Sequence, residues 1–200
     1  MTNPAPASRP TPEEALLDAA ERLLVDIGYA KITTRRLAAE ADVNHGLVHY
    51  YFGSLENLFV QVLERFTARM IERQRSMYAA EMPFIEKWRT AMRYLVVDSD
   101  YQKVWWELQA LAWNRPELRE HVAQVDDEWR AVLTEALAEP RERYGLEMPL
   151  DALVSLVITF NSGIIQERLA GITTGHAELL GWIDEWLEGK EKERWRQRKR

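Results

Sequence analysis

The stretch of twenty residues from 33 to 52 constrains the fold most, because it predicts two short helices that meet at a tight turn. Thr33 and Thr34 can accept hydrogen bonds from the free N–H groups of a helix start. Leu37, Ala38 and Ala41 then fall on one helix face. The first half of the stretch therefore predicts a short amphipathic helix.

The second half of the stretch predicts the turn and the second helix. Asp42 is one of the few non-glycine residues that tolerate the left-handed backbone such a turn needs. Val43 would fill the angle between the helices, and Asn44 can cap a second helix that runs through HGLVHYY. This is the layout of a helix-turn-helix, whose second helix enters the major groove of DNA.

The residues around this stretch carry a family resemblance. The run AKITTRRLAAEADVNHGLVHYYFGSLENLF, preceded by ALLDAAERLLVDIGY, resembles the DNA-binding domain of TetR-type transcriptional regulators over about 55 residues. The resemblance implies an all-α protein with an N-terminal three-helix helix-turn-helix domain and a C-terminal helical domain for ligand binding and dimerisation. Asp42 stands where the family usually has Gly. Leu55 stands where it usually has Lys, so one expected phosphate contact is missing.

The second helix of the motif supplies the candidate DNA-reading residues. Side chains near its N-terminal end read base edges, so Asn44 and His45 are candidates for hydrogen bonds to bases and Leu47 for contact with a thymine methyl. Tyr50 and Tyr51 are candidates for phosphate contacts through their hydroxyls. The predicted DNA-binding residues are Thr33, Thr34, Arg35, Asn44, His45, Gly46, Leu47, His49, Tyr50, Tyr51 and Ser54.

His45 and His49 are four residues apart, so they share a helix face and could in principle bind a metal ion. The residues between them include no glutamate, and no third ligand is nearby. We therefore predict either contact with the DNA groove or a place on the helix surface for this pair, and no metal site.

Composition limits the class of protein. Two hundred residues, 46% of them hydrophobic, suffice for one large or two small helical domains. Zero cysteines exclude disulfides and thiolate metal sites. No apolar run reaches the roughly 18 residues of a membrane span, and the N-terminal residues lack a signal-peptide segment. We expect a soluble, cytoplasmic protein.

The net charge of −6 is compatible with DNA binding only if a local basic patch exists. Residues 1–60 supply no obvious patch, because their acids outnumber their bases. This balance counts against tight binding unless the acids point away from the groove. The bases are Arg9, Arg22, Lys31, Arg35 and Arg36; the acids are Glu13, Glu14, Asp18, Glu21, Asp26, Glu40, Asp42 and Glu56.

The order of the domains follows from helix signals. Residues 1–10 are predicted to form a flexible arm. The resemblance implies that such an arm can touch the neighbouring minor groove, for which Arg9 is the candidate residue. The DNA-binding domain covers 11–56 and begins with a helix from about Thr11 to Gly28. A connecting helix capped by Ser54 covers 57–75, the effector-binding and dimerisation domain covers 76–195, and a basic tail covers 196–200.

The C-terminal region shows only helical periods. Pro140 and Gly145 are predicted to interrupt the helix that begins at Pro116. The helix over 150–169 is apolar nearly all round, which indicates burial on both sides, and a last amphipathic helix covers 177–193. These two helices fit the four-helix dimer interface that the resemblance implies, with candidate residues Leu153, Val157, Ile164, Ile165, Leu179, Ile183 and Trp186.

Tryptophans cluster in the middle of the C-terminal region. The cluster indicates either an aromatic-lined pocket for a hydrophobic or aromatic effector or ordinary core packing by large side chains. Neighbouring polar residues could orient a ligand, or bond one helix to another. The candidate pocket residues are Trp88, Met92, Trp105, Trp106, Gln109, Trp113, Trp129, Phe160 and Asn161.

No catalytic motif, cofactor site or ligand cluster appears, and His121 and His176 look like exposed helix residues, so we do not expect an enzyme. The leading hypothesis is a ligand-responsive transcriptional regulator, most often a repressor in this family. It would bind a palindromic DNA operator as a homodimer and be released by a small effector of unknown identity. The alternative, favoured by Leu55, is a helical dimeric interaction or sequestration module without specific DNA binding. A helical-bundle enzyme is a third reading.

Overall fold

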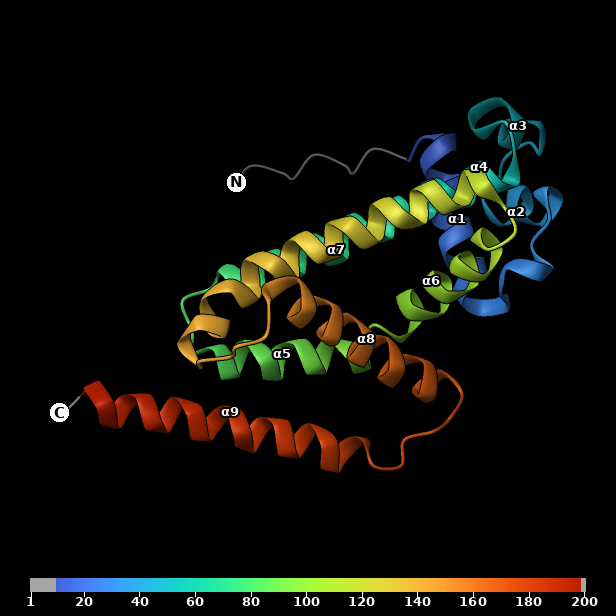
Figure 1. The fold of residues 1–200 in the computed structure, drawn as a ribbon. Coiled ribbons are helices and arrows are strands. Elements are labelled where there is room, and N and C mark those ends of the chain that lie inside the picture. The colour runs from blue at the N-terminus through green and yellow to red at the C-terminus, as the bar shows by residue number, and fades with distance from the viewer. Residues whose placement is uncertain (1–9, 199–200) are drawn as a thin grey trace, which may run out of the picture. The chain divides into compact units, whose positions relative to one another are not determined.

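The computed structural model describes residues 10–198, and all regular structure among them is helical (Figure 1), which confirms the all-α prediction. The predicted arm with Arg9, and the last two residues of the predicted basic tail, lie outside the described residues. The elements are α1 Pro12–Ile27, a 3₁₀ turn η1 Tyr29–Lys31, α2 Thr34–Glu40, α3 Gly46–Phe52, α4 Leu55–Ala79, α5 Phe84–Val97, α6 Ser99–Ala112, α7 Pro116–Arg143, α8 Leu150–Leu169 and α9 His176–Arg198.

The chain divides into two compact units. The head unit comprises the described part of Met1–Thr67 together with Lys103–Val122, and the body unit comprises Ala68–Gln102 together with the described part of Ala123–Arg200. The boundaries fall inside α4, α6 and α7, so three continuous helices have residues in both units. Residues 103–122, which the sequence prediction placed with the effector domain, belong to the head unit.

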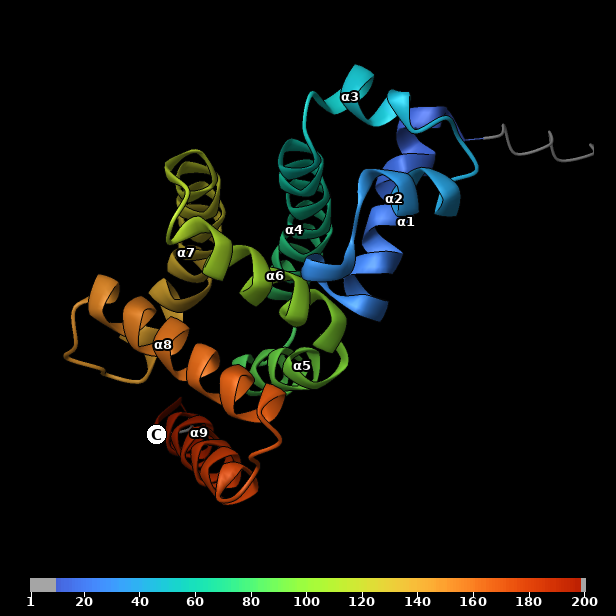
Figure 2. The same ribbon diagram turned by 90° about the vertical axis from the view of Figure 1, so that its right-hand side faces the viewer.

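The head unit is built on α1, α2 and α3, which pack against one another (Figure 2). Thr11 caps α1 in a reciprocal capping box with Glu14, and Gly28 ends the helix with φ 75°. The predicted start and end of this helix are therefore confirmed. The core below it includes the side chains of Leu16, Leu23, Leu37, Val48, Phe52, Leu58, Phe59, Val62 and Leu63, all of them buried.

The first part of α4 is fixed to α1 by charge as well as by packing. The Arg65 guanidinium lies 2.7 Å from the Asp18 carboxylate and 2.9 Å from that of Glu21. The predicted capping of α4 is also present, because the Ser54 hydroxyl accepts a hydrogen bond from Asn57 N–H at 3.1 Å. The helix runs from Leu55 to Ala79 and so includes the whole predicted connecting segment 57–75.

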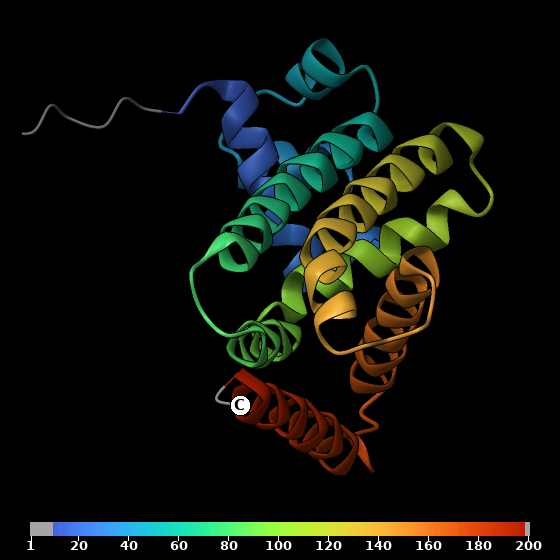
Figure 3. The same ribbon diagram turned by 60° about the vertical axis from the view of Figure 1, so that its left-hand side comes forward.

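The body unit has two clusters of buried apolar side chains. One joins Ile85 of α5, Leu187 of α9 and Tyr144, and the other joins α7 to α8 through Leu137 and Val154. α9 lies alongside α5 (Figure 3). The two helices are linked by ion pairs, because the Arg89 guanidinium on α5 donates to both oxygens of the Asp184 carboxylate and to Glu188, all on α9. These bonds raise the pKa of Arg89.

The prediction that Pro140 interrupts its helix is wrong. α7 continues from Pro116 to Arg143 with Pro140 inside it. Proline removes the hydrogen bond of its own N–H, but it stands in the last turn, and its own carbonyl still accepts from Tyr144 N–H at 2.9 Å. The Pro140 ring is also buried. The break comes at Gly145, whose φ of 66° ends the helix as predicted.

The prediction that His176 is an exposed helix residue is also wrong. His176 is the first residue of α9 and is buried. Its Nε2 lies 2.6 Å from the Glu167 carboxylate near the end of α8. The sequence could not indicate this contact, because it depends on how the loop through Gly171 and Gly175 returns the chain.

α8 and α9 each present apolar side chains to the outside of the single chain. Val154 and Ile164 of α8 are buried, whereas Leu156 and Leu169 on the same helix are exposed. Exposed Leu179 and Trp182 lie on α9. No helix within the described part of the chain has the length and apolar character needed to cross a membrane.

Candidate nucleic-acid interface

The turn between α2 and α3 has the geometry that its residues predict. Asp42 adopts φ 53°, in the left-handed region, and among the described residues it is the only non-glycine to do so. The Asn44 side-chain oxygen then accepts a hydrogen bond from Gly46 N–H at 2.8 Å, where α3 begins. A side chain added at Gly46 would approach that oxygen at 3.3 Å. The cap position of α3 is His45, which makes no side-chain cap bond, so the prediction that Asn44 caps this helix is wrong by one residue. The Asn44 side chain instead closes the turn that precedes the helix.

One face of α3 is buried and the other is exposed. Val48 and Phe52, apolar residues four positions apart on one helix face, are buried. His45, His49 and Tyr50 are exposed, and 78% of the Tyr50 surface is accessible. The outward face of the helix thus carries imidazole and phenol groups, which can hydrogen-bond to bases or phosphates.

Contacts among neighbouring residues fix the aromatic side chains at the C-terminal end of α3. The rings of Tyr50 and Tyr51 meet edge to face with centroids 5.0 Å apart, an arrangement that favours both side chains. His49 Nδ1 lies 3.0 Å from the Gly53 carbonyl oxygen. Because a carbonyl only accepts, Nδ1 carries the hydrogen, and in the neutral ring Nε2 is left as an acceptor. Asn57 donates to the Phe52 carbonyl at 3.1 Å and fixes α3 to α4.

The hydroxyl residues predicted to contact phosphates also cap helices. The Thr33 hydroxyl accepts from Arg36 N–H at 3.2 Å at the start of α2, and Ser54 caps α4. Arg35 and Arg36 are exposed in the first turn of α2. Arg36 was not among the predicted DNA-binding residues, although its position beside Arg35 in the sequence could have indicated it.

Four acidic residues of the head unit lie beside arginine side chains. Glu40 pairs with Arg22 at 3.2 Å, Asp18 and Glu21 pair with Arg65, and Glu56 pairs with Arg115 at 2.9 Å. The bond from Arg115 lowers the pKa of Glu56. Two of these cations, Arg65 and Arg115, come from beyond residue 60. The charge count over residues 1–60 therefore overstated the repulsion that a DNA phosphate would meet.

Comparison with known proteins agrees with this geometry. Residues 16–62 match the family model described as bacterial regulatory proteins, tetR family. Residues 16–62 form a DNA-binding domain of the TetR family. The matched segment runs from α1 into α4 and contains the whole helix-turn-helix.

Full-length relatives and solved structures extend the likeness beyond the head unit. The transcriptional repressor AcnR of Corynebacterium glutamicum is 25% identical over 189 residues, which cover 90% of this chain and 95% of AcnR. A regulator from Rhodococcus sp. RHA1 superposes with a TM-score of 0.72 at 22% identity, over 89% of this chain and 96% of its own. A regulator from Saccharomonospora viridis, solved in complex with choline, has a TM-score of 0.72 at 17% identity, over 88% and 93% of the two chains.

The predicted effector residues are divided between the two units of the chain. The body unit contains Trp88, Met92, Trp129, Phe160 and Asn161, and the head unit contains Trp105, Trp106, Gln109 and Trp113. In the body unit, the rings of Trp88 and Phe160 lie with centroids 6.3 Å apart. The adjacent Asn161 has a buried side-chain oxygen without a hydrogen-bond partner. Trp113 lies on the surface of the head unit with 69% of its area exposed.

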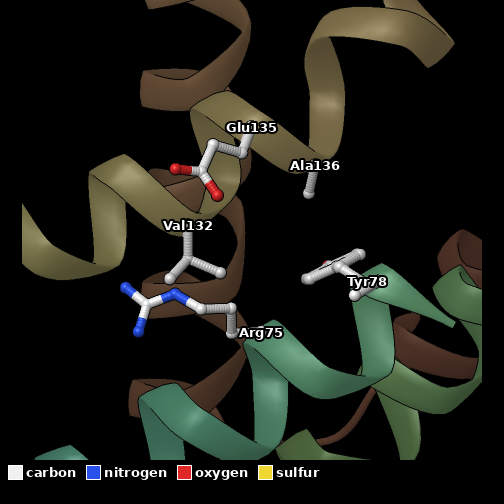
Figure 4. Close-up of a pocket in the computed structure, with 6 residues that line it drawn as sticks. Arg75, Tyr78, Val132, Glu135 and Ala136 are labelled. Atoms are coloured by element: carbon white, nitrogen blue, oxygen red, sulfur yellow. The ribbon is translucent and has the colours of Figure 1, made fainter.

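A hollow of about 200 Å³ opens in the body unit, away from the predicted aromatic set. Figure 4 shows Arg75 and Tyr78 extending from α4 towards side chains of α7. Burial raises the pKa of Tyr78 to about 12, so its hydroxyl stays protonated at neutral pH. The hollow has an apolar floor with one positive and one negative side chain at its edge. Its lining residues are Arg75, Tyr78, Ala79, Val132, Glu135 and Ala136.

The predicted interface residues differ in where they lie within the single chain. Ile164 is buried. Leu153 and Val157 pack against the cluster of α7 and α8, and Ile183 and Trp186 pack against the cluster of α5 and α9. Ile165 is half-buried, and Leu179 is exposed. The exposed apolar surface of α8 and α9 is made of Leu156, Leu169, Leu179 and Trp182.

Proposed function

We propose that this chain is a ligand-responsive transcriptional repressor. It binds a palindromic operator in the cytoplasm as a homodimer, and a small hydrophobic or aromatic effector releases it. The observation that carries the proposal is the exposed face of α3, within a segment that matches the tetR family model. We expect no catalytic activity, in keeping with the other members of a family of regulators.

The hydrogen bonds within α3 suggest how each side chain reads DNA. The Asn44 oxygen is occupied by Gly46 N–H, so the amide group offers its two N–H donors to acceptors such as guanine O6 or a purine N7. The free Nε2 of neutral His49 accepts instead, and it suits the amino group of adenine or cytosine. Tyr50 projects far enough to bond a phosphate. We infer a recognition helix that combines one donor and one acceptor.

Dimerisation is supported by the apolar surface that α8 and α9 leave exposed. Leu156 and Trp182 each have more than half of their surface accessible in the single chain, and side chains of this kind usually mark an interface. A two-fold dimer would present two copies of α3 to one face of DNA. The half-sites would then lie about one helical turn apart, roughly 34 Å.

The body unit is the proposed site of the effector. The buried Asn161 oxygen lacks a partner, and an unpaired buried acceptor is costly, so a ligand that donates a hydrogen bond there would relieve the cost. The nearby Trp88 and Phe160 rings favour an apolar or aromatic body. The complex of the Saccharomonospora viridis regulator with choline supports a small molecule as ligand for this fold.

The test is selection of random duplex DNA by the purified protein at moderate and at raised salt, followed by sequencing of the retained DNA. We expect a palindromic motif whose binding weakens as salt rises, because phosphate contacts release counterions. Asn44→Ala and His45→Ala should change the preferred sequence, whereas Tyr50→Ala should weaken binding to all sequences alike. His121→Ala, which removes a histidine distant in sequence from α3, is the matched control.

Two results would contradict the proposal. If no duplex is enriched at either salt concentration, the chain does not read DNA, and the interaction or sequestration module becomes the better interpretation. If the motif is enriched but is unchanged in both Asn44→Ala and His45→Ala, the assignment of base reading to these residues is wrong.

A further inference from the structure

Part of the head unit comes from far along the chain. Val104 and Leu108 of α6 are buried, and Ala112 and Leu118 form a cluster with Val60 of α4. α6 begins in the body unit at Ser99 and passes into the head unit between Gln102 and Lys103. The helix that packs on the head is therefore a continuous extension of a segment of the body unit.

Glu107 on α6 makes a direct bond to the end of α1. Its carboxylate accepts a hydrogen bond from Tyr29 N–H at 2.7 Å, although 78 residues separate the two in the sequence. Tyr29 begins the short 3₁₀ turn that follows Gly28, and N–H groups at a helical start lack a partner within the helix. Glu107 supplies that partner from another element.

The backbone at Gly28 is shaped around this carboxylate. A Cβ atom added to Gly28 would lie 2.8 Å from Glu107 Oε1, too close for an ordinary contact. Gly28 also has φ 75°, which disfavours other residues. The positive φ is the reason that favours glycine here, because the flexible end of the Glu107 side chain could shift away from a Cβ atom. In this structure the Glu107 carboxylate lies against the peptide that connects α1 to the following turn.

The side chain of Tyr29 makes contacts as well as its backbone N–H. Its ring meets Phe59 of α4 edge to face, with centroids 5.0 Å apart. Its hydroxyl lies beside the pair formed by Glu56 and Arg115; burial and the charge of Glu56 raise the pKa of Tyr29. Tyr29 thus joins α1, α4 and α6 in one place, and Glu107 is the α6 side chain that bonds to its backbone.

We propose that Glu107 is the positioning residue through which α6 sets the orientation of the helix-turn-helix. A displacement of residues 99–102 in the body unit acts through α6 on Glu107, then through Tyr29 on the end of α1, from which the chain continues into α2. This inference rests on the proposed function. It adds a specific carboxylate, and a route through α6 and α1, to the general coupling between effector and DNA.

The coupling can be tested with DNA alone, because linkage between two sites is reciprocal. If the body unit acts on the head through Glu107, then DNA bound to the head acts on the body unit through the same residue. The probe is the duplex enriched from the random pool, added at saturating concentration. Hydrogen exchange of residues 84–102 in the body unit, with and without the duplex, is the measurement.

The variants are Glu107→Ala, Glu107→Gln and Glu120→Ala. Glu120 is an exposed acid of α7 within the head unit, so it controls for the loss of one negative charge. Without DNA, the Tyr29 amide should exchange roughly tenfold faster or more in Glu107→Ala, because a charge-assisted hydrogen bond is lost. Glu107→Gln keeps an acceptor oxygen and should fall between Glu107→Ala and the wild type. Glu120→Ala should leave the Tyr29 amide unchanged.

With DNA bound, we expect the wild type and Glu120→Ala to show altered exchange in residues 84–102. In Glu107→Ala, this response should fall to less than about a third of the wild-type response, although the head still binds the duplex. A full response in Glu107→Ala, or no response in the wild type, would overturn the role of Glu107 while leaving DNA binding intact. If no duplex is bound at all, the proposed function fails instead, and the two failures are thereby distinguished.

Discussion

Replacing Phe59 should separate the stability of the two units. Phe59 is 1% exposed and is one of the largest fully buried side chains. Removing a buried phenylalanine ring costs about 3–5 kcal/mol, including the cavity that it leaves. Loss of the edge-to-face contact with Tyr29 adds about 0.5–1.5 kcal/mol. Phe59→Ala should therefore cost about 4–6 kcal/mol, out of the roughly 5–15 kcal/mol that typically stabilises a domain.

The assay is hydrogen exchange resolved along the chain, supported by urea denaturation. A loss of about 4 kcal/mol speeds exchange through global opening by roughly a thousandfold, since each 1.4 kcal/mol is a factor of ten. The acceleration should appear in residues 12–67 and 103–122 and be much smaller in α8 and α9. Phe59→Leu keeps most of the volume and should cost only about 1–2 kcal/mol.

Ile164→Ala is the matched control, because Ile164 is buried in the body unit and its loss should cost about 2–5 kcal/mol there. It should accelerate exchange in α8 and α9 more than in α1 to α3. If Phe59→Ala and Ile164→Ala accelerate exchange equally everywhere, the chain unfolds as one cooperative unit. That result would refute the claim that the head unit and the body unit have separate stabilities.

Three further predictions concern charge, pH and assembly. Leu55→Lys should restore a phosphate contact and steepen the slope of log affinity against log salt by about 0.9; an unchanged slope, equal to that of Leu55→Gln, would show that no phosphate is within reach. Tyr78 has its pKa raised by burial to about 12 in the folded state, so it stabilises the fold below pH 10 and loses that contribution as pH rises towards 12. At pH 11 the loss should be about 1.4 kcal/mol relative to Tyr78→Phe, measured by urea denaturation; identical pH profiles would contradict it. Trp182→Asp should yield a folded monomer by light scattering, because Trp182 is 65% exposed in the single chain. Val97→Asp, also at an exposed site, should remain a dimer. If Trp182→Asp is still a dimer, α9 is not part of the interface.

Local signals predicted the helices of the head well. Thr11, Thr33 and Ser54 cap the helices assigned to them, since a cap depends on residues within one turn. The left-handed Asp42 was predicted for the same reason. Asn44 lies one residue before the cap position of α3, which is His45. The inward direction of Val48 and Phe52 followed from helical spacing, and so the exposed face of α3 could be named from sequence.

Contacts between segments that are distant in the sequence could not be predicted from local sequence patterns. Glu107 and Arg115 complete the head from 78 and 59 residues away along the chain, and nothing in the neighbourhood of either residue distinguishes it from an ordinary surface charge. The burial of His176 depends on the path of the loop that precedes α9. Pro140 was predicted from its helix propensity to interrupt α7, but tertiary packing keeps it within the helix. The roles of the tryptophans likewise depend on which unit each one joins.

The split origin of the head unit bears on the engineering of hybrid regulators. A chimera that joins residues 1–67 of this chain to the C-terminal region of another regulator would take Tyr29 without Glu107 and Glu56 without Arg115. The transplanted head would carry an unpaired N–H group, and its Val60 would lose Ala112 and Leu118. A working graft therefore has to move residues 103–122 together with the N-terminal segment, as two pieces of one interchangeable part.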